Sequence, residues 1–147
     1  MVLRLLPGTG LALPPNAGVL RFGMSEQAAQ WVASTLENVR PWEPMRGVRW
    51  MFSFVHGGVQ VTAYACTACT EQTLGHLVVE RCERVPDGPA DVPVVVGDID
   101  LFGYPIHELI EVLEPAERKL LLSATLNPRS THYLAAVRLD ACEDDRR

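Results

Sequence analysis

The feature that most constrains the fold is a strict alternation of apolar and other residues between positions 48 and 65, broken by two glycines. One side of this alternation carries Val48, Trp50, Phe52, Phe54, Val59, Val61, Ala63 and Ala65. Gly57 and Gly58 separate the two runs and tolerate the positive φ of a tight turn. Because successive residues of a strand face opposite sides of a sheet, the pattern predicts a hairpin with one buried face.

A helix is predicted before this hairpin. Ser25 is a good N-cap, because its hydroxyl can accept from the unpaired amides of the first turn. The following apolar residues recur at helical spacing, and Arg40-Pro41 is expected to end the helix. The predicted buried stripe is Ala28, Val32, Leu36 and Val39.

A second helix is predicted in the C-terminal half. Pro105 suits the first helical position, where its missing amide costs nothing. The stripe that follows has the spacing i, i+3, i+4, i+7 and consists of Ile106, Leu109, Ile110 and Leu113. Residues 117–126 are ambiguous: their composition permits a short helix, but their alternation favours one strand of a terminal hairpin. Residues 7–18, rich in proline and glycine, are expected to be an extended or irregular lead-in.

Together these elements predict an α+β fold in one domain spanning 1–147. Two helices would pack on one face of an antiparallel sheet of about six or seven strands, with short strands also near 19–22, 73–82 and 94–96. Phe22-Gly23 and Phe102-Gly103 lie 80 positions apart, each after a short strand and before a helix. Residues 18–84 and 94–140 are therefore candidate half-repeats.

Composition narrows the functional classes. The chain is 48% hydrophobic and 21% charged, as ordinary globular proteins are. A net charge of −5 gives no positive field to attract phosphate backbones, so nucleic-acid binding is not expected. No run approaches the roughly 20 apolar residues of a membrane helix. Four cysteines are too few for a disulfide scaffold, which favours a reducing, cytoplasmic location.

A short motif suggests a family resemblance. Leu20-Arg-Phe-Gly-Met-Ser25, followed by an amphipathic helix, resembles the helix start of the beta-lactamase inhibitory proteins and of small lipoproteins of the outer-membrane assembly machinery. The chain is also similar to actinobacterial proteins that pair such a start with a later DIDLFG segment, here residues 98–103. The resemblance implies helices on one face of an antiparallel sheet, whose other face is presented to a partner.

No catalytic or metal-binding constellation is predicted. Cys66 and Cys69 have the spacing of half a zinc site, but a structural zinc needs four ligands and the second pair is missing. Cys82 would lie more than about 25 Å away along a strand. Ordinary thiols at a turn are the preferred interpretation, and neither a metal nor a cofactor is expected. Asp98 and Asp100 are read as polar residues at a strand end, and His56 and His107 as surface histidines.

Four residues are predicted to bind a partner. Trp42 lies in a proline-bracketed loop, while Trp31 and Trp50 are expected in the core. The unburied side of the hairpin shows Arg49, Met51, Ser53, Gln60, Thr62 and Tyr64. Tyrosine, methionine and arginine among small polar groups are typical of interfaces. The predicted binding residues are Trp42, Arg49, Met51 and Tyr64.

The leading functional hypothesis is a non-enzymatic protein-binding module, for example an inhibitor or an immunity-type partner. The alternative is a small-molecule-binding or hydrolytic domain whose site forms only in three dimensions. A third interpretation is a small zinc protein.

Overall fold

A computed structural model describes residues 2–14, 17–43, 47–66, 72–82, 88–122 and 133–141, with only the backbone of 119–122. The described strands form two five-stranded sheets. Sheet A has the order β3 (Gly18–Arg21), β2 (Gly10–Leu13), β1 (Leu3–Leu6), β8 (Val94–Val96) and β9 (Ile99–Asp100). Sheet B has the order β10 (Ala136–Asp140), β7 (Leu74–Arg81), β6 (Val59–Ala65), β5 (Met51–His56) and β4 (Arg40–Trp42). The described helices are α1 (Glu26–Ser34), α2 (Ile106–Val112) and α3 (Pro115–Leu122).

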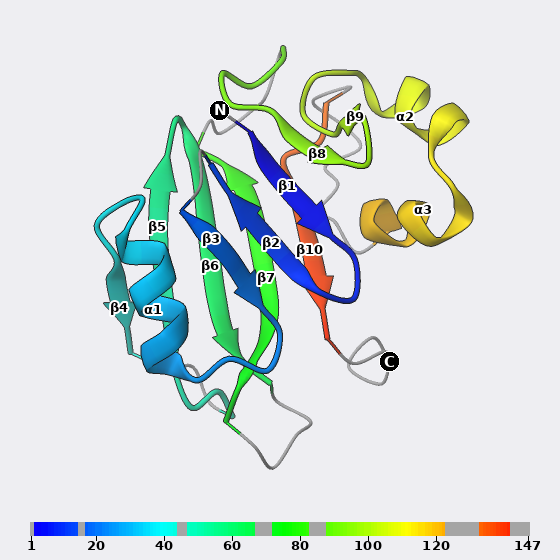
Figure 1. The fold of residues 1–147 in the computed structure, drawn as a ribbon. Helices are drawn as coiled ribbons and strands as arrows, with labels where there is room; N and C mark the ends of the chain where they lie inside the picture. Colours follow the sequence, from blue (N-terminus) through cyan, green and yellow to red (C-terminus); the bar gives the residue numbers. More distant parts are fainter. Residues whose placement is uncertain are drawn as a thin grey trace.

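The two sheets pack face to face, with α1 on the same side of sheet B as sheet A (Figure 1). Of the described strand pairs, β1–β8 is parallel and the others are antiparallel. This parallel pair joins the N-terminal strand β1 to a segment some 90 residues later in the sequence. It makes β1 the central strand of sheet A. Helices α2 and α3 lie beside the β8–β9 end (Figure 1).

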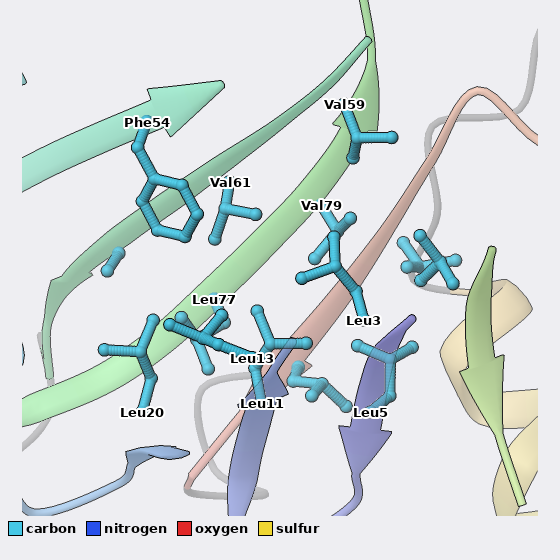
Figure 2. Close-up of a cluster of buried hydrophobic side chains, with 14 of the residues drawn as sticks. Leu3, Leu5, Leu11, Leu13, Leu20, Phe54, Val59, Val61, Leu77 and Val79 are labelled. Carbon is cyan, nitrogen blue, oxygen red and sulfur yellow. The ribbon is translucent and has the colours of Figure 1, made fainter. Parts of the chain in front are cut away.

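The core lies between the sheets. Figure 2 shows leucines of sheet A reaching toward aromatic and aliphatic side chains of sheet B. The labelled core residues are Leu3, Leu5, Leu11, Leu13, Leu20, Phe54, Val59, Val61, Leu77 and Val79, each 5% exposed or less. Burying this surface is the main force that holds the sheets together.

The predicted central hairpin is confirmed. β5 and β6 pair antiparallel from Met51↔Tyr64 to His56↔Val59. Gly57 and Gly58 have φ of 57° and 80°, as a two-residue turn with positive φ at both positions requires. The side of the hairpin that was predicted to be buried is the buried one, because Phe52 and Phe54 are fully or almost fully buried.

The α+β class is confirmed, with mostly antiparallel pairing. The arrangement of two helices on one face of a sheet of six or seven strands is not confirmed. Residues 7–18, expected to be an extended or irregular lead-in, contain β2, which pairs with both β1 and β3. These strands build a second sheet, which takes the covering position that the sequence pattern assigned to helices. Pro7 and Gly8 lie in the turn between β1 and β2, while Gly10 and Gly18 are the first residues of β2 and β3. Proline and glycine so close together are typical of loops, which explains why the segment resembled one.

Of the two alternatives for the ambiguous segment 117–126, the preferred strand is wrong and the helix is right where the structure describes it. Residues 115–122 are helical, and 123–126 lie outside the described residues. The helix start is locally determined, because the Glu117 carboxylate accepts from the Glu114 amide at 2.9 Å. This is half of a capping box, and it satisfies an amide that a helix start leaves open. A run of eight residues is too short for its apolar period to separate helix from strand.

Helix α1 starts as predicted and ends early. The Ser25 hydroxyl accepts from the Ala28 amide at 3.2 Å. The helix ends at Ser34, where the hydroxyls of Ser34 and Thr35 hydrogen-bond the carbonyls three residues back. Such bonds compete with continuation of the helix. The chain then forms the short edge strand β4, whereas a loop was expected around Trp42.

Two aromatic ring placements were predicted wrongly. Trp31 was expected in the core but is 73% exposed, because Ala29 and Ala33 form the buried line of α1. Trp31 lies two residues from each, on the opposite side of the helix. His56 was expected at the surface but is 8% exposed, because it continues the buried alternation of β5. Its Nδ1 lies 3.1 Å from a Glu37 carboxylate oxygen.

Helix α2 forms at the predicted place, with Leu109 and Leu113 buried and Ile110 48% exposed. Pro105 is its N-cap residue, one position before the expected first helical position. The helix is followed by α3, whereas α1 is followed by strands. The structure therefore gives the half-repeats 18–84 and 94–140 no support.

Candidate functional site

The side of sheet B that faces away from sheet A carries three of the four predicted binding residues, and we call it the outer face. Strand register places side chains of five strands in one row across it. From edge to edge this row is Trp42, Met51, Tyr64, His76 and Asp140. A second row beside it is Arg40, Ser53, Thr62, Val78 and Arg138. Paired residues of neighbouring strands point to the same side, so both rows lie on the outer face, where Ser53, His76 and Asp140 are buried.

Three of the four predicted residues are brought together by this register. Trp42, Met51 and Tyr64 come from β4, β5 and β6 and are neighbours in the first row. Trp42 is 50% exposed, and Met51 and Tyr64 are half-buried. Arg49 is exposed and precedes β5 by two residues, so it lies outside the rows. Trp42, Met51 and Tyr64 thus share a sheet face, and the structure does not place Arg49 on it.

The β10 end of the row contains a buried polar network that the sequence did not predict. His76 Nδ1 lies 2.6 Å from Asp140 Oδ1, and Arg138 Nε donates to the same oxygen at 2.8 Å. The side chains of His76 and Asp140 are 1% and 3% exposed. Burial by itself raises the pKa of the Asp140 carboxyl, but the hydrogen bonds from His76 and Arg138 outweigh it and lower the pKa below its usual value. Asp140 is therefore an ionised acceptor at neutral pH, and His76 donates through Nδ1.

This network fixes the ring of Tyr64. The Tyr64 and His76 rings stack with centroids 4.5 Å apart and planes 18° apart. The Arg138 guanidinium carbon lies 5.9 Å from the Tyr64 centroid. An aromatic ring that is held in this way loses little conformational freedom when it contacts a partner.

Trp42 is fixed at the opposite end of the face. Its indole N–H donates to the Ser53 hydroxyl on the neighbouring strand. Because its only hydrogen-bond donor is used within the protein, the exposed half of the ring offers carbon surface alone.

Two signals in the sequence could have indicated the network, but neither was sufficient. A histidine in a predicted strand and an aspartate at the end of another are common features. Their pairing depends on the register of β7 against β10, which are 64 residues apart at this pair.

Other residues considered from the sequence do not form a site. Cys66 is buried, Cys82 is exposed, and Cys69 lies outside the described residues. Within the part of the chain that the structure describes, no three His, Cys, Asp or Glu residues are grouped to hold a metal. The Asp100 carboxylate accepts from the Phe102 amide at 3.1 Å, which is a local turn interaction. Among the described helices, none is both long and apolar enough to cross a membrane.

Comparison of the chain with models of protein families, with curated proteins and with solved structures gave no match. Any functional argument therefore depends on the geometry of the outer face.

Proposed function

We propose that the protein is a binding module that recognises another protein through the outer face of sheet B. The observation that carries this proposal is the row Trp42, Met51 and Tyr64, in which three large, partly exposed side chains are neighbours across three strands. Tryptophan, tyrosine and methionine are enriched at interfaces, because they bury much area for little loss of freedom.

The rigidity of the row supports recognition rather than plain solvent exposure. Tyr64 is stacked on a buried histidine, and the Trp42 indole is hydrogen-bonded to Ser53. Residues that only face solvent gain nothing from being held in place. At an interface, the same order reduces the entropy that binding costs.

The alternative of a hydrolytic domain is favoured by one observation. An aspartate that hydrogen-bonds the Nδ1 of a histidine is the arrangement by which hydrolases orient a general base. In this protein the histidine side chain is only 1% exposed, so a substrate would not reach its ring. The His76–Asp140 pair therefore fits the support of Tyr64 better than catalysis.

A capture experiment with matched variants tests the proposal. The protein is immobilised, and the proteins it retains from lysate of its own host are quantified for wild type, Trp42→Ala, Tyr64→Ala and Trp31→Ala. Trp31 is the matched control, because it is a more exposed tryptophan on a different element, α1. We expect at least one protein to be retained by wild type and Trp31→Ala and lost from both other variants.

Binding of that purified protein should weaken about tenfold or more for each face variant, as for a truncated interface aromatic. Retention that all variants share, or that only Trp31→Ala removes, would refute the outer face as the binding surface. Circular dichroism of each variant confirms that the fold is kept.

A further inference from the structure

Binding through the row Trp42, Met51 and Tyr64 requires that Trp42 be held in place, and β4 alone holds it weakly. Trp42 is the last residue of β4, which is three residues long and forms one edge of sheet B. All three residues of β4 are exposed, so the strand buries little of its own surface. Short edge strands with few buried contacts are the parts of a sheet that open most readily.

The register of β4 on β5 continues before β4 begins. The first residue of β4, Arg40, pairs with Ser53. Counting back from this pair at the same register places Glu37 opposite His56. The structure contains this contact, because His56 Nδ1 lies 3.1 Å from Glu37 Oε1. Glu37 is therefore a cross-strand neighbour of His56, although it precedes the strand.

The contact between Glu37 and His56 is shielded from water. The side chains of His56 and Glu37 are 10% and 39% exposed. Because a carboxylate oxygen can only accept, the His56 ring donates through Nδ1. A hydrogen bond to a charged acceptor is stronger than one between neutral groups, and burial strengthens it further. This bond and the core contacts of Leu36 and Val39 fasten the segment that leads into β4.

A second side-chain hydrogen bond lies at the other end of the segment. The Trp42 indole N–H donates to the Ser53 hydroxyl on β5. Residues 37–42 are thus held against β5 by one side-chain hydrogen bond at each end, with the backbone pairs of β4 between them. Without the first bond, fraying that begins at Glu37 can continue through β4 to Trp42.

From this arrangement, which rests on the proposed function, we infer that Glu37 and His56 are positioning residues for the binding surface. Their hydrogen bond keeps β4 on β5 and thereby fixes the Trp42 ring for a partner. His56 lies on the buried side of β5, and its neighbour Glu37 lies on the same side. Neither side chain therefore lies on the outer face, so their effect on binding passes through β4.

Hydrogen exchange of the Trp42 indole N–H tests the inference without a partner. The signal is followed by NMR in ¹⁵N-labelled wild type, Glu37→Ala and Glu37→Gln, and Trp42→Phe assigns it. Glu108→Ala, which removes an exposed carboxylate on α2, is the matched control. The amide of Val61, a fully buried residue on the central strand β6, reports global unfolding.

We expect Glu37→Ala to speed exchange of the Trp42 indole N–H about tenfold relative to the Val61 amide, because the hydrogen bond that opposes opening of β4 is lost. Glu37→Gln should keep much of the protection, since its amide oxygen can still accept from His56. Glu108→Ala should leave the exchange of Trp42 unchanged.

The effect on binding is measured by repeating the capture experiment with Glu37→Ala and Glu108→Ala. The host protein that Trp42→Ala fails to retain should bind Glu37→Ala more weakly and Glu108→Ala as strongly as wild type. Its loss of affinity for Glu37→Ala should match the fraction of molecules in which β4 has opened, because only the closed form presents Trp42.

Two results would overturn the inference. One is exchange of the Trp42 indole N–H in Glu37→Ala at the wild-type rate. The other is equal acceleration at Trp42 and Val61, which would show a loss of global stability and no particular hold on β4. If Glu37→Ala speeds only the Trp42 exchange while no host protein depends on Trp42, the proposed function is wrong and the positioning of Trp42 stands.

Discussion

Removal of the Asp140 carboxylate is the sharpest test of the network under Tyr64. In Asp140→Ala, His76 Nδ1 and Arg138 Nε lose a shared acceptor at 2.6 and 2.8 Å. A hydrogen bond to a charged group contributes about 1.5–3 kcal/mol. Breaking a buried ion pair on one side costs about 3–5 kcal/mol. We therefore expect the free energy of unfolding to fall by about 4 kcal/mol.

Asp140→Asn is the milder companion variant. The asparagine amide oxygen can still accept a hydrogen bond, but the substitution removes the negative charge. We therefore expect the free energy of unfolding to fall by about half as much as in Asp140→Ala. Asp91→Ala removes an exposed aspartate outside the strands and serves as the control, with a change within about 0.5 kcal/mol. Urea unfolding followed by circular dichroism gives the free energies, and a constant slope with urea confirms comparable transitions.

The pH dependence of the same variants tests the charge. The pKa of Asp140 is lowered in the folded protein, so folding favours its ionised form. The stabilisation is complete above the unfolded pKa of about 4 and is lost as pH falls through the lower, folded pKa. The part of the difference between wild type and Asp140→Asn that comes from the Asp140 charge should therefore be complete above about pH 5, and should shrink as pH falls below about 4. A loss under about 1 kcal/mol at pH 7, or a difference that grows as pH falls below about 4, would refute the network as described.

Three further substitutions test the local structure by urea unfolding. Ser25→Ala should cost about 1 kcal/mol, because a first-turn amide of α1 loses its acceptor; a silent change would mean that the cap does not stabilise the helix. Gly10→Ala should lower the free energy of unfolding by about 3 kcal/mol or more, because φ is +146° and a Cβ would overlap the Leu20 carbonyl oxygen on β3. An unchanged free energy of unfolding would contradict the close approach of β2 and β3. Trp31→Ser should change stability by less than about 0.5 kcal/mol, and a larger loss would show that α1 buries this side chain.

Local signals in the sequence determined several elements of this protein. The turn at Gly57-Gly58 and the alternation around it determined the β5–β6 hairpin, because positive φ and a period of two are properties of nearby residues alone. The start of α1 is determined in the same way by the Ser25 cap. These signals need no contact that is distant in the chain.

Part of the candidate site was also readable from the sequence. The alternation of β5 and β6 is enough to place Met51 and Tyr64 on the side away from the core. Trp42 could be selected by its proline neighbours, but its place beside Met51 could not, because a strand at 40–42 was not predicted. Arg49 was assigned to the same face by extending the alternation beyond the point where the strand begins.

Only the tertiary structure decided how the strands divide between two sheets and what supports Tyr64. The parallel pairing of β1 with β8 and the pairing of β7 with β10 join segments far apart in sequence. The residues of these four strands do not indicate which strand each one pairs with. The alternation in a strand specifies which of its sides is buried, and not which strand lies beside it. His76 and Asp140 therefore became one hydrogen-bonded pair only when β10 docked against β7 in register, which brings together polar groups that water would otherwise solvate separately.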